Sequence, residues 1–160
     1  MKKAAVAFFL VLALTLSGCS FLLKEASSKT FTKAGLSITL TDAFYESEYI
    51  TYTAFYSMAD VAVFTLKEEF TLLEGFENYS LNEYCQLVIS NNGKSSSVQE
   101  DDNLTYFVYE NIANGKNFSF FCSVYKSGDA FWLVQFTCLN DKYDEYYDDF
   151  ITWAKSVKFE

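Results

Sequence analysis

The stretch of residues 118–138 constrains the fold of this chain more than any other part of it. Aromatic and β-branched residues fill two runs of strand length, and the polar residues 126–129 lie between them. This pattern predicts two antiparallel strands joined by a tight turn that contains Gly128. With a three-residue loop, residues 127–129, one face of the hairpin becomes wholly apolar and comprises Phe118, Phe120, Cys122, Val124, Trp132, Val134, Phe136 and Cys138. We expect this face to be buried at the centre of the fold.

Further strands are predicted where β-branched and aromatic residues recur, at residues 36–40, 49–56, 61–67 and 104–112. The second and third of these runs have a short connection, which favours an antiparallel hairpin. Asn114-Gly115 is the strongest short hairpin signal in the chain and predicts a two-residue turn. Such a turn places Thr105, Phe107, Tyr109 and Asn111 beside residues 118–124, so we expect a three-stranded meander.

Two helices are predicted. Ser80 and Glu83 match a capping box, in which each side chain satisfies a backbone donor of the first turn. Apolar residues then recur at helical spacing until Asn91-Asn92-Gly93, a typical helix end. Residues 141–155 are amphipathic, and the apolar side comprises Tyr143, Tyr146, Phe150, Trp153 and Val157. Residues 157–159 are expected to return as a short edge strand.

Residues 1–19 have the pattern of a targeting signal. Lys2 and Lys3 precede an apolar run, residues 4–16, that is short for a membrane span. The run ends in Leu16-Ser17-Gly18-Cys19, which resembles the lipobox of bacterial lipoproteins. The resemblance implies cleavage between Gly18 and Cys19 and attachment of diacylglycerol to the Cys19 thiol, a modification whose acyl chains anchor a protein firmly. The alternative is an ordinary secretory signal followed by a chance cysteine.

We therefore divide the chain into a lipoprotein signal peptide (residues 1–18), a lipidated cysteine with its tether (residues 19–30) and one globular domain (residues 31–160). Tether-like composition continues to Lys33. Cleavage removes two lysines and no acidic residue, so the formal net charge moves from −9 to −11. Anionic lipid head groups repel such a domain, and we expect it to face away from the membrane that holds it. The residue usage, with no Arg and many Lys, Asn, Tyr and Phe, favours an AT-rich, Gram-positive source.

Composition also argues against several function classes. The chain has no Arg and no His. A nucleic-acid partner needs a basic surface, and an acidic chain without Arg does not supply one. His is the commonest general base and the commonest zinc ligand. We therefore expect no nucleic-acid partner, no metal, no cofactor and no catalysis.

Two groups of residues are candidates for a catalytic or metal site. Five carboxylates share the polar side of the last predicted helix: Asp141, Asp144, Glu145, Asp148 and Asp149. A calcium site or an acid–base pair needs converging carboxylates, whereas a helical stripe diverges and is usually a solvated side. Cys85, Cys122 and Cys138 lack a basic partner, and the predicted hairpin separates Cys122 from Cys138 by roughly 13 Å, too far for a disulfide. We expect these three cysteines to be small buried residues.

The twelve tyrosines and seventeen phenylalanines exceed what a core of this size needs. An exposed aromatic patch binds protein partners or apolar ligands. The candidate patch comprises Tyr45, Tyr49, Tyr52, Tyr56, Tyr125 and Phe131. An alternative of equal weight is that these rings form the periphery of the core with their hydroxyls in water.

The order of the predicted elements resembles the PsbP/DcrB-like family. Residues 35–40 (GLSITL) with Phe44 are similar to its opening strand, and residues 131–136 (FWLVQF) with residues 150–159 are similar to its close. The family contains exported bacterial lipoproteins, plant photosystem accessory subunits and the Ran-binding Mog proteins. The resemblance covers about residues 31–160 and implies an α+β fold, an α/β/α sandwich around a central antiparallel sheet of about six strands. It also implies an accessory or adaptor role.

Our leading hypothesis is a lipid-anchored, extracytoplasmic accessory module that binds a protein partner or assists a membrane complex without catalysis. The second is a receptor for a small apolar or aromatic ligand in a pocket between sheet and helix. A remote third is a hydrolase that uses a carboxylate pair.

The anchor can be tested directly. A Cys19→Ala variant should move from the membrane fraction to the soluble fraction, because it lacks the thiol that carries the acyl chains. Cell fractionation measures this. A variant that stays with the membrane would contradict the lipoprotein assignment.

Overall fold

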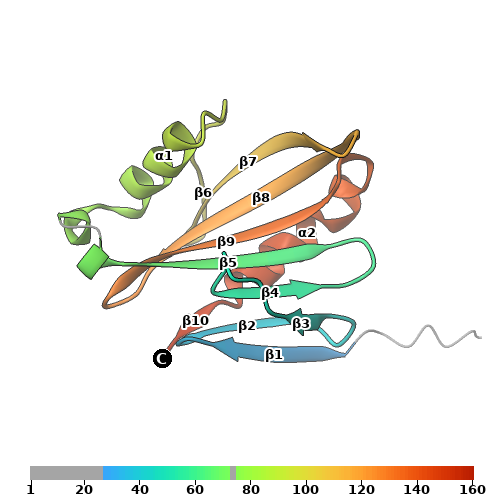
Figure 1. Cartoon of the computed structure of the whole chain (residues 1–160), viewed down its shortest axis with the longest axis horizontal. Coiled ribbons are helices and arrows are strands. Elements are labelled where there is room, and N and C mark those ends of the chain that lie inside the picture. Colours follow the sequence, from blue (N-terminus) through green and yellow to red (C-terminus); the bar gives the residue numbers. More distant parts are fainter. Residues whose placement is uncertain (1–26, 73–74) are drawn as a thin grey trace, which may run out of the picture.

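The computed structural model describes residues 27–72 and 75–160, which form two antiparallel sheets and two α-helices (Figure 1). The larger sheet has seven strands in the order β3-β4-β5-β9-β8-β7-β6, and the smaller has three in the order β1-β2-β10. The strands are β1 Ser28–Lys33, β2 Leu36–Thr41, β3 Tyr45–Ser47, β4 Ala54–Ser57, β5 Ala62–Glu69, β6 Gln99–Asp101, β7 Leu104–Ala113, β8 Lys116–Lys126, β9 Ala130–Leu139 and β10 Lys158–Phe159. The helices are α1 Leu81–Asn91 and α2 Tyr143–Lys155, with 3-10 turns η1 Phe70–Leu72, η2 Phe76–Asn78 and η3 Asn140–Lys142. The fold is α+β, as predicted, with two sheets instead of a single sheet of about six strands.

The predicted meander is confirmed as β7-β8-β9. Asn114 and Gly115 form a two-residue turn between Ala113 and Lys116, with φ of 52° and 73°. Positive φ at both positions is what a type I′ turn requires, and Asn and Gly adopt it at low cost. The predicted register of β7 with β8 follows from this turn and is also confirmed.

The register predicted for the hairpin of β8 and β9 is wrong by one residue. Ser127 N–H donates to Ala130 C=O at 2.9 Å, so that residues 128–129 alone form the loop. Phe121 is therefore the partner of Phe136. Side chains alternate between the two faces of a strand. A shift of one residue in the pairing therefore changes which side chains of β9 share a face with a given side chain of β8. The wholly apolar face that we expected is replaced by two faces, each partly apolar.

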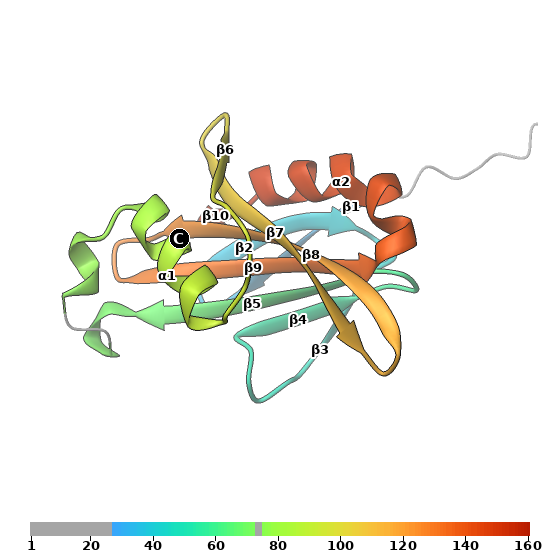
Figure 2. The same cartoon turned by 90° about the horizontal axis from the view of Figure 1, so that it is seen from above.

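Different elements cover the two faces of the seven-stranded sheet. The small sheet and α2 pack on one face, and α1 packs on the other, against β7 and β8. Figure 2 shows α2 running along one side of the large sheet, and α2 contacts β2 of the small sheet. The molecule thus has three layers, as the predicted sandwich requires, with a small sheet sharing one outer layer with α2.

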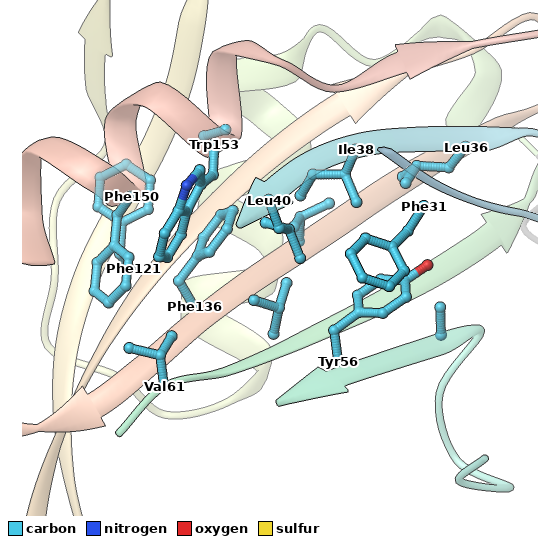
Figure 3. Close-up of a cluster of buried hydrophobic side chains, with 14 of the residues drawn as sticks. Phe31, Leu36, Ile38, Leu40, Tyr56, Val61, Phe121, Phe136, Phe150 and Trp153 are labelled. Carbon is cyan, nitrogen blue, oxygen red and sulfur yellow. The ribbon is translucent and has the colours of Figure 1, made fainter. Parts of the chain in front are cut away.

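The main core lies between the large sheet and the layer of β2 and α2 (Figure 3). The ring of Phe136 lies 5.5 Å from that of Phe150 and 6.2 Å from that of Trp153, measured between centroids. Ile38 on β2 faces inward and is fully buried in the same cluster. Burial of an aromatic or large aliphatic side chain contributes about 1.5–3 kcal/mol, so this cluster is the chief source of stability.

A second, smaller core lies under α1. The predicted capping box is present: Ser80 Oγ accepts from Glu83 N–H, and the Glu83 carboxylate accepts from Ser80 N–H at 2.8 Å. Tyr84 stacks on Phe131 of β9 with centroids 4.2 Å apart, and its hydroxyl donates to the Glu68 carboxylate of β5. These contacts fix α1 to one end of the sheet.

The structure differs from the sequence prediction in the type or the bounds of three segments. Ser28–Lys33, which we assigned to the tether or its continuation, forms β1 and pairs with β2. The predicted strand 49–56 begins only at Ala54, and the preceding residues form a loop. Gln99–Asp101, for which no strand was predicted, forms the short strand β6. The signal peptide, Cys19 and the tether before residue 27 lie outside the described residues.

No helix in the described part of the chain is long and apolar enough to cross a membrane.

The main core predicts a large effect of one substitution. Phe136→Ala should lower the free energy of unfolding by about 3–5 kcal/mol, because a fully buried ring leaves a cavity. Ile112→Ala, at a side chain that is 73% exposed, should change it by less than about 0.5 kcal/mol. Urea unfolding followed by circular dichroism measures both values. Similar losses for the two variants would contradict the assignment of the core.

Candidate interaction surface

Two phenylalanines lie side by side on the face of the large sheet that α1 only partly covers. Phe55 on β4 is the partner of Phe64 on β5, so their rings share one face. Both rings are half-buried. The residues next to them along each strand face the core instead. Since α1 packs against β7 and β8, the end of this face formed by β3, β4 and β5 stays open.

The loop between β3 and β4 extends this pair of rings. Tyr49 lies 4.7 Å from Phe55, Tyr52 lies 4.8 Å from Phe64, and Phe55 lies 5.0 Å from Phe64, between ring centroids. These are separations of favourable aromatic pairs. Tyr49 is 56% exposed, and Ile50 in the same loop is fully exposed. We call Tyr49, Ile50, Tyr52, Phe55 and Phe64 the aromatic surface.

A second pair of rings lies further along the same face. Tyr109 and Phe120 are stacked with centroids 4.7 Å apart and planes 2° from parallel. Gln135, the partner of Phe64 on β9, separates the two groups and donates from its side-chain amide to Cys122 Sγ at 3.6 Å. Burial raises the pKa of Tyr109, so its hydroxyl keeps its proton at neutral pH. The open face therefore presents apolar rings together with hydroxyl and amide groups.

An open cleft of about 470 Å³ adjoins the aromatic surface. Tyr49, Ile50 and Tyr52 line one part of it, and Lys33 and Glu46 line another. Lys33 Nζ and Glu46 Oε1 form an ion pair of 3.2 Å. Both side chains are substantially exposed, so this pair contributes little to stability and remains available for other polar contacts.

The structure separates the six residues of the predicted patch, and three of them lie at the surface. Tyr45 is 74% exposed, and the register of β3 with β4 places it on the same face as Phe55. Tyr49 and Tyr52 belong to the aromatic surface. The sequence analysis missed Phe55 and Phe64, although the alternation of side chains in β4 and β5 would have placed both opposite the core-facing residues.

The other three predicted residues belong to the interior or its margin, so including them in an exposed patch was wrong. Tyr56 is fully buried against Phe31, at 4.8 Å between centroids. Phe131 is fully buried under Tyr84 of α1. Tyr125 is half-buried, and its hydroxyl donates to a backbone C=O of α2 at 2.8 Å. Alternation explains all three, because each side chain faces a layer that covers its strand.

The spaces between sheet and helices, where we expected a ligand pocket as the second possibility, are filled by side chains. Phe121, Phe150 and Trp153 are at most 5% exposed and occupy the space under α2. Tyr84 and Cys85 occupy the space under α1 and are at most 1% exposed. A small ligand would therefore have to use the open cleft beside the aromatic surface.

The three cysteines of the described residues are free and buried, as predicted. Burial raises the pKa of Cys85 to about 12 and, with nearby acids, that of Cys138 to about 11. Burial also raises the pKa of Cys122. All three thiols are protonated at neutral pH, and thiols in that state are weak nucleophiles. Cys122 and Cys138 belong to different cores, so they face opposite sides of the sheet.

The five carboxylates of the predicted stripe are exposed, as expected of a solvated side; Asp141 lies in η3 and the other four lie in α2. Partial burial and the neighbouring Asp148 raise the pKa of Asp149. Across residues 27–72 and 75–160, no group of three or more His, Cys, Asp or Glu side chains is placed to hold a metal ion.

No family model matches the sequence, and no curated protein matches it. Solved structures do match its fold. The cyanobacterial PsbP protein, CyanoP, from Synechocystis sp. PCC 6803 is similar with a TM-score of 0.54 at 10% identity, over 91% of this chain and 99% of that one. LpqN, involved in cell envelope biogenesis of Mycobacterium tuberculosis, is similar with a TM-score of 0.50 at 10% identity, over 84% and 91% of the two chains.

A protein of Bacteroides thetaiotaomicron VPI-5482 is also similar, with a TM-score of 0.54 at 9% identity, over 84% of this chain and 48% of that one. At these identities the likeness concerns the fold alone. The described domain thus has a PsbP-like fold, as the sequence resemblance implied.

Tyr56 and Tyr125 of the predicted patch should respond differently to loss of the hydroxyl. Within the described residues, the buried Tyr56 hydroxyl has no hydrogen-bond partner, so Tyr56→Phe should leave stability unchanged or raise it by up to about 1 kcal/mol. The Tyr125 hydroxyl makes two hydrogen bonds, so Tyr125→Phe should lower stability by about 1 kcal/mol. Thermal or urea unfolding compares the two. The reverse order would contradict the assignment of these hydroxyls.

Proposed function

We propose that this chain is a lipid-anchored, extracytoplasmic accessory module that binds a protein partner through the aromatic surface. The observation that carries the proposal is the chain of ring contacts from Tyr49 through Phe55 and Phe64 to Tyr52, next to the fully exposed Ile50. Contiguous exposed apolar groups of this kind are enriched at protein interfaces. Packed rings also lose little conformational entropy on binding, because their neighbours already restrict them.

The position of the aromatic surface suits a partner that approaches beside or above the anchored domain. The segment between Cys19 and Ser28 spans at most about 30 Å when extended, so it holds the domain near the membrane. Ser28 begins β1, and Lys33, at the other end of β1, lines the same cleft as Tyr49 and Ile50. The aromatic surface therefore lies about 17 Å, the length of β1, from the end where the tether enters.

The acidity of the chain defines the partner further. With a formal charge of −11 after cleavage, the module attracts a basic protein and repels anionic lipid and nucleic acid. LpqN shares the fold and is involved in cell envelope biogenesis, which supports a role in the cell envelope for this chain as well.

One observation favours a second candidate function, a receptor for a small apolar or aromatic ligand. The cleft of about 470 Å³ has the size of a small-molecule site, and Tyr49, Ile50 and Tyr52 form the apolar part of its lining. A compound that raises the melting temperature of the wild-type chain, but not of a Tyr52→Ser variant, would favour this candidate.

Site-specific photo-crosslinking in living cells tests the partner. A photoreactive amino acid at position 50, in the aromatic surface, should capture one recurrent protein. The same amino acid at position 72 is the matched control, because Leu72 is 79% exposed but lies outside the aromatic surface, in η1. Adding Phe55→Ser should reduce capture at position 50 by about tenfold, since a central ring of an interface carries about 1–2 kcal/mol or more.

Two outcomes would contradict the proposal. Equal capture of the same protein from positions 50 and 72 would show that this protein lies near the domain without binding the aromatic surface specifically. Absence of any recurrent product at position 50 would argue against a stable protein partner.

A further inference from the structure

Half of β7 is an unpaired sheet edge. On the side away from β8, β6 pairs with β7 only from Leu104 to Tyr106. Ser96 Oγ then donates to Val108 C=O at 2.7 Å. From there to Ala113, no other element of the described residues pairs with this edge. Figure 1 shows the second half of β7 at the outer margin of the sheet.

The hairpin turn determines which backbone groups this edge presents. A two-residue turn makes Ala113 and Lys116 a hydrogen-bonded pair, and such pairs alternate with pairs whose groups point outward. The N–H and C=O groups of Val108, Glu110 and Ile112 therefore point away from β8. The bond from Ser96 to Val108 agrees with this assignment. Among the described residues, the outward groups of Glu110 and Ile112 have no partner, so the edge offers an unoccupied hydrogen-bonding row.

A cleft of about 730 Å³ lies along this edge. Val108, Tyr109 and Glu110 of β7 line it, together with Tyr143 and Asp144 of α2. The Tyr143 hydroxyl is buried and lacks a hydrogen-bond partner within the described residues. A strand added to β7 would place alternate side chains in this cleft.

The charges along the edge indicate which kind of segment can bind there as an added strand. Glu110 and Asp144 are exposed acids on the α2 side of the cleft. Lys94, the basic residue of the lining, lies over the Tyr109 ring at 4.5 Å, on the other side of the strand. A second copy of the chain is disfavoured, because antiparallel pairing of two β7 edges about Glu110 would place like charges opposite each other.

We propose that the β7 edge from Val108 to Ile112 binds an extended basic segment of a partner protein as an additional antiparallel or parallel strand. Backbone hydrogen bonds to Glu110 and Ile112 hold the segment, and its basic side chains face Glu110 and Asp144. This site shares no residue with the aromatic surface. An experiment can therefore rule out one of the two proposed sites and leave the other unaffected.

Hydrogen exchange of the full chain in detergent micelles tests the site without a variant. The probe is a synthetic peptide of alternating Lys and Thr, and the matched control is a Glu and Thr peptide of the same length. The Lys-Thr peptide should slow exchange of about three amides in residues 107–113, those of Val108, Glu110 and Ile112. No slowing with the Lys-Thr peptide, or equal slowing with the Glu-Thr peptide, would overturn the proposal.

A pair of variants separates the backbone contact from the charge. Glu110→Pro removes the carboxylate together with an outward N–H, a loss that edge strands tolerate, and should weaken peptide binding about tenfold. Glu110→Gln keeps that N–H and should weaken binding only about twofold to fivefold. Capture from position 50 should be unchanged in both variants. Equal binding by Glu110→Pro and the wild type would overturn the proposal.

The same exchange experiment tests other occupants of the edge. Slow exchange of residues 107–113 without peptide, increasing with protein concentration, would identify a second copy and overturn the proposal. Slow exchange without peptide that is independent of concentration would identify a segment of the chain itself and would also overturn it.

Discussion

Strands β8 and β9 carry apolar side chains on both faces, so consecutive residues supply two different cores. Phe121 and Phe136 pack with α2, whereas Cys122 and Leu133 pack on the α1 side. Both faces of β8 and β9 are covered by other elements. A slip of their register would therefore expose apolar side chains on both faces at once. The positions of α1, α2 and the small sheet all depend on this two-sided burial, and so does the part of the face that stays open.

The sequence supported prediction of elements with local signals and was less informative where tertiary contacts decide. The capping box at Ser80 and the turn at Asn114-Gly115 each involve few neighbouring residues, and both were located correctly. The loop after Lys126 fits two or three residues equally well by composition, and only the packing of both faces selects two. The candidate patch suffered from the same limit: the aromatic content gave no direction for each ring, and Tyr56 faces inward while Phe55 faces outward. β1 was missed because its alternation is mostly polar, with Phe31 as its one buried residue.

The two proposed sites use different chemistry on one acidic domain. The aromatic surface offers rigid rings beside a cleft, which suits a folded protein surface. The β7 edge offers backbone groups beside Glu110 and Asp144, which suits an extended basic segment. They lie toward opposite edges of the seven-stranded sheet, β3–β5 and β7. On both proposals, a partner with a folded part and a basic tail would bind the two sites at once, and the link would increase its effective affinity.

The central claim is that the aromatic surface is covered by a protein in the cell. Hydroxyl-radical footprinting, compared between intact cells and the purified full chain, tests it most directly. The account predicts that Tyr49, Tyr52 and Phe55 are oxidised much less in cells than in the purified chain, while the exposed Leu72 is oxidised equally in both. Equal oxidation of the three rings in both samples would contradict the claim.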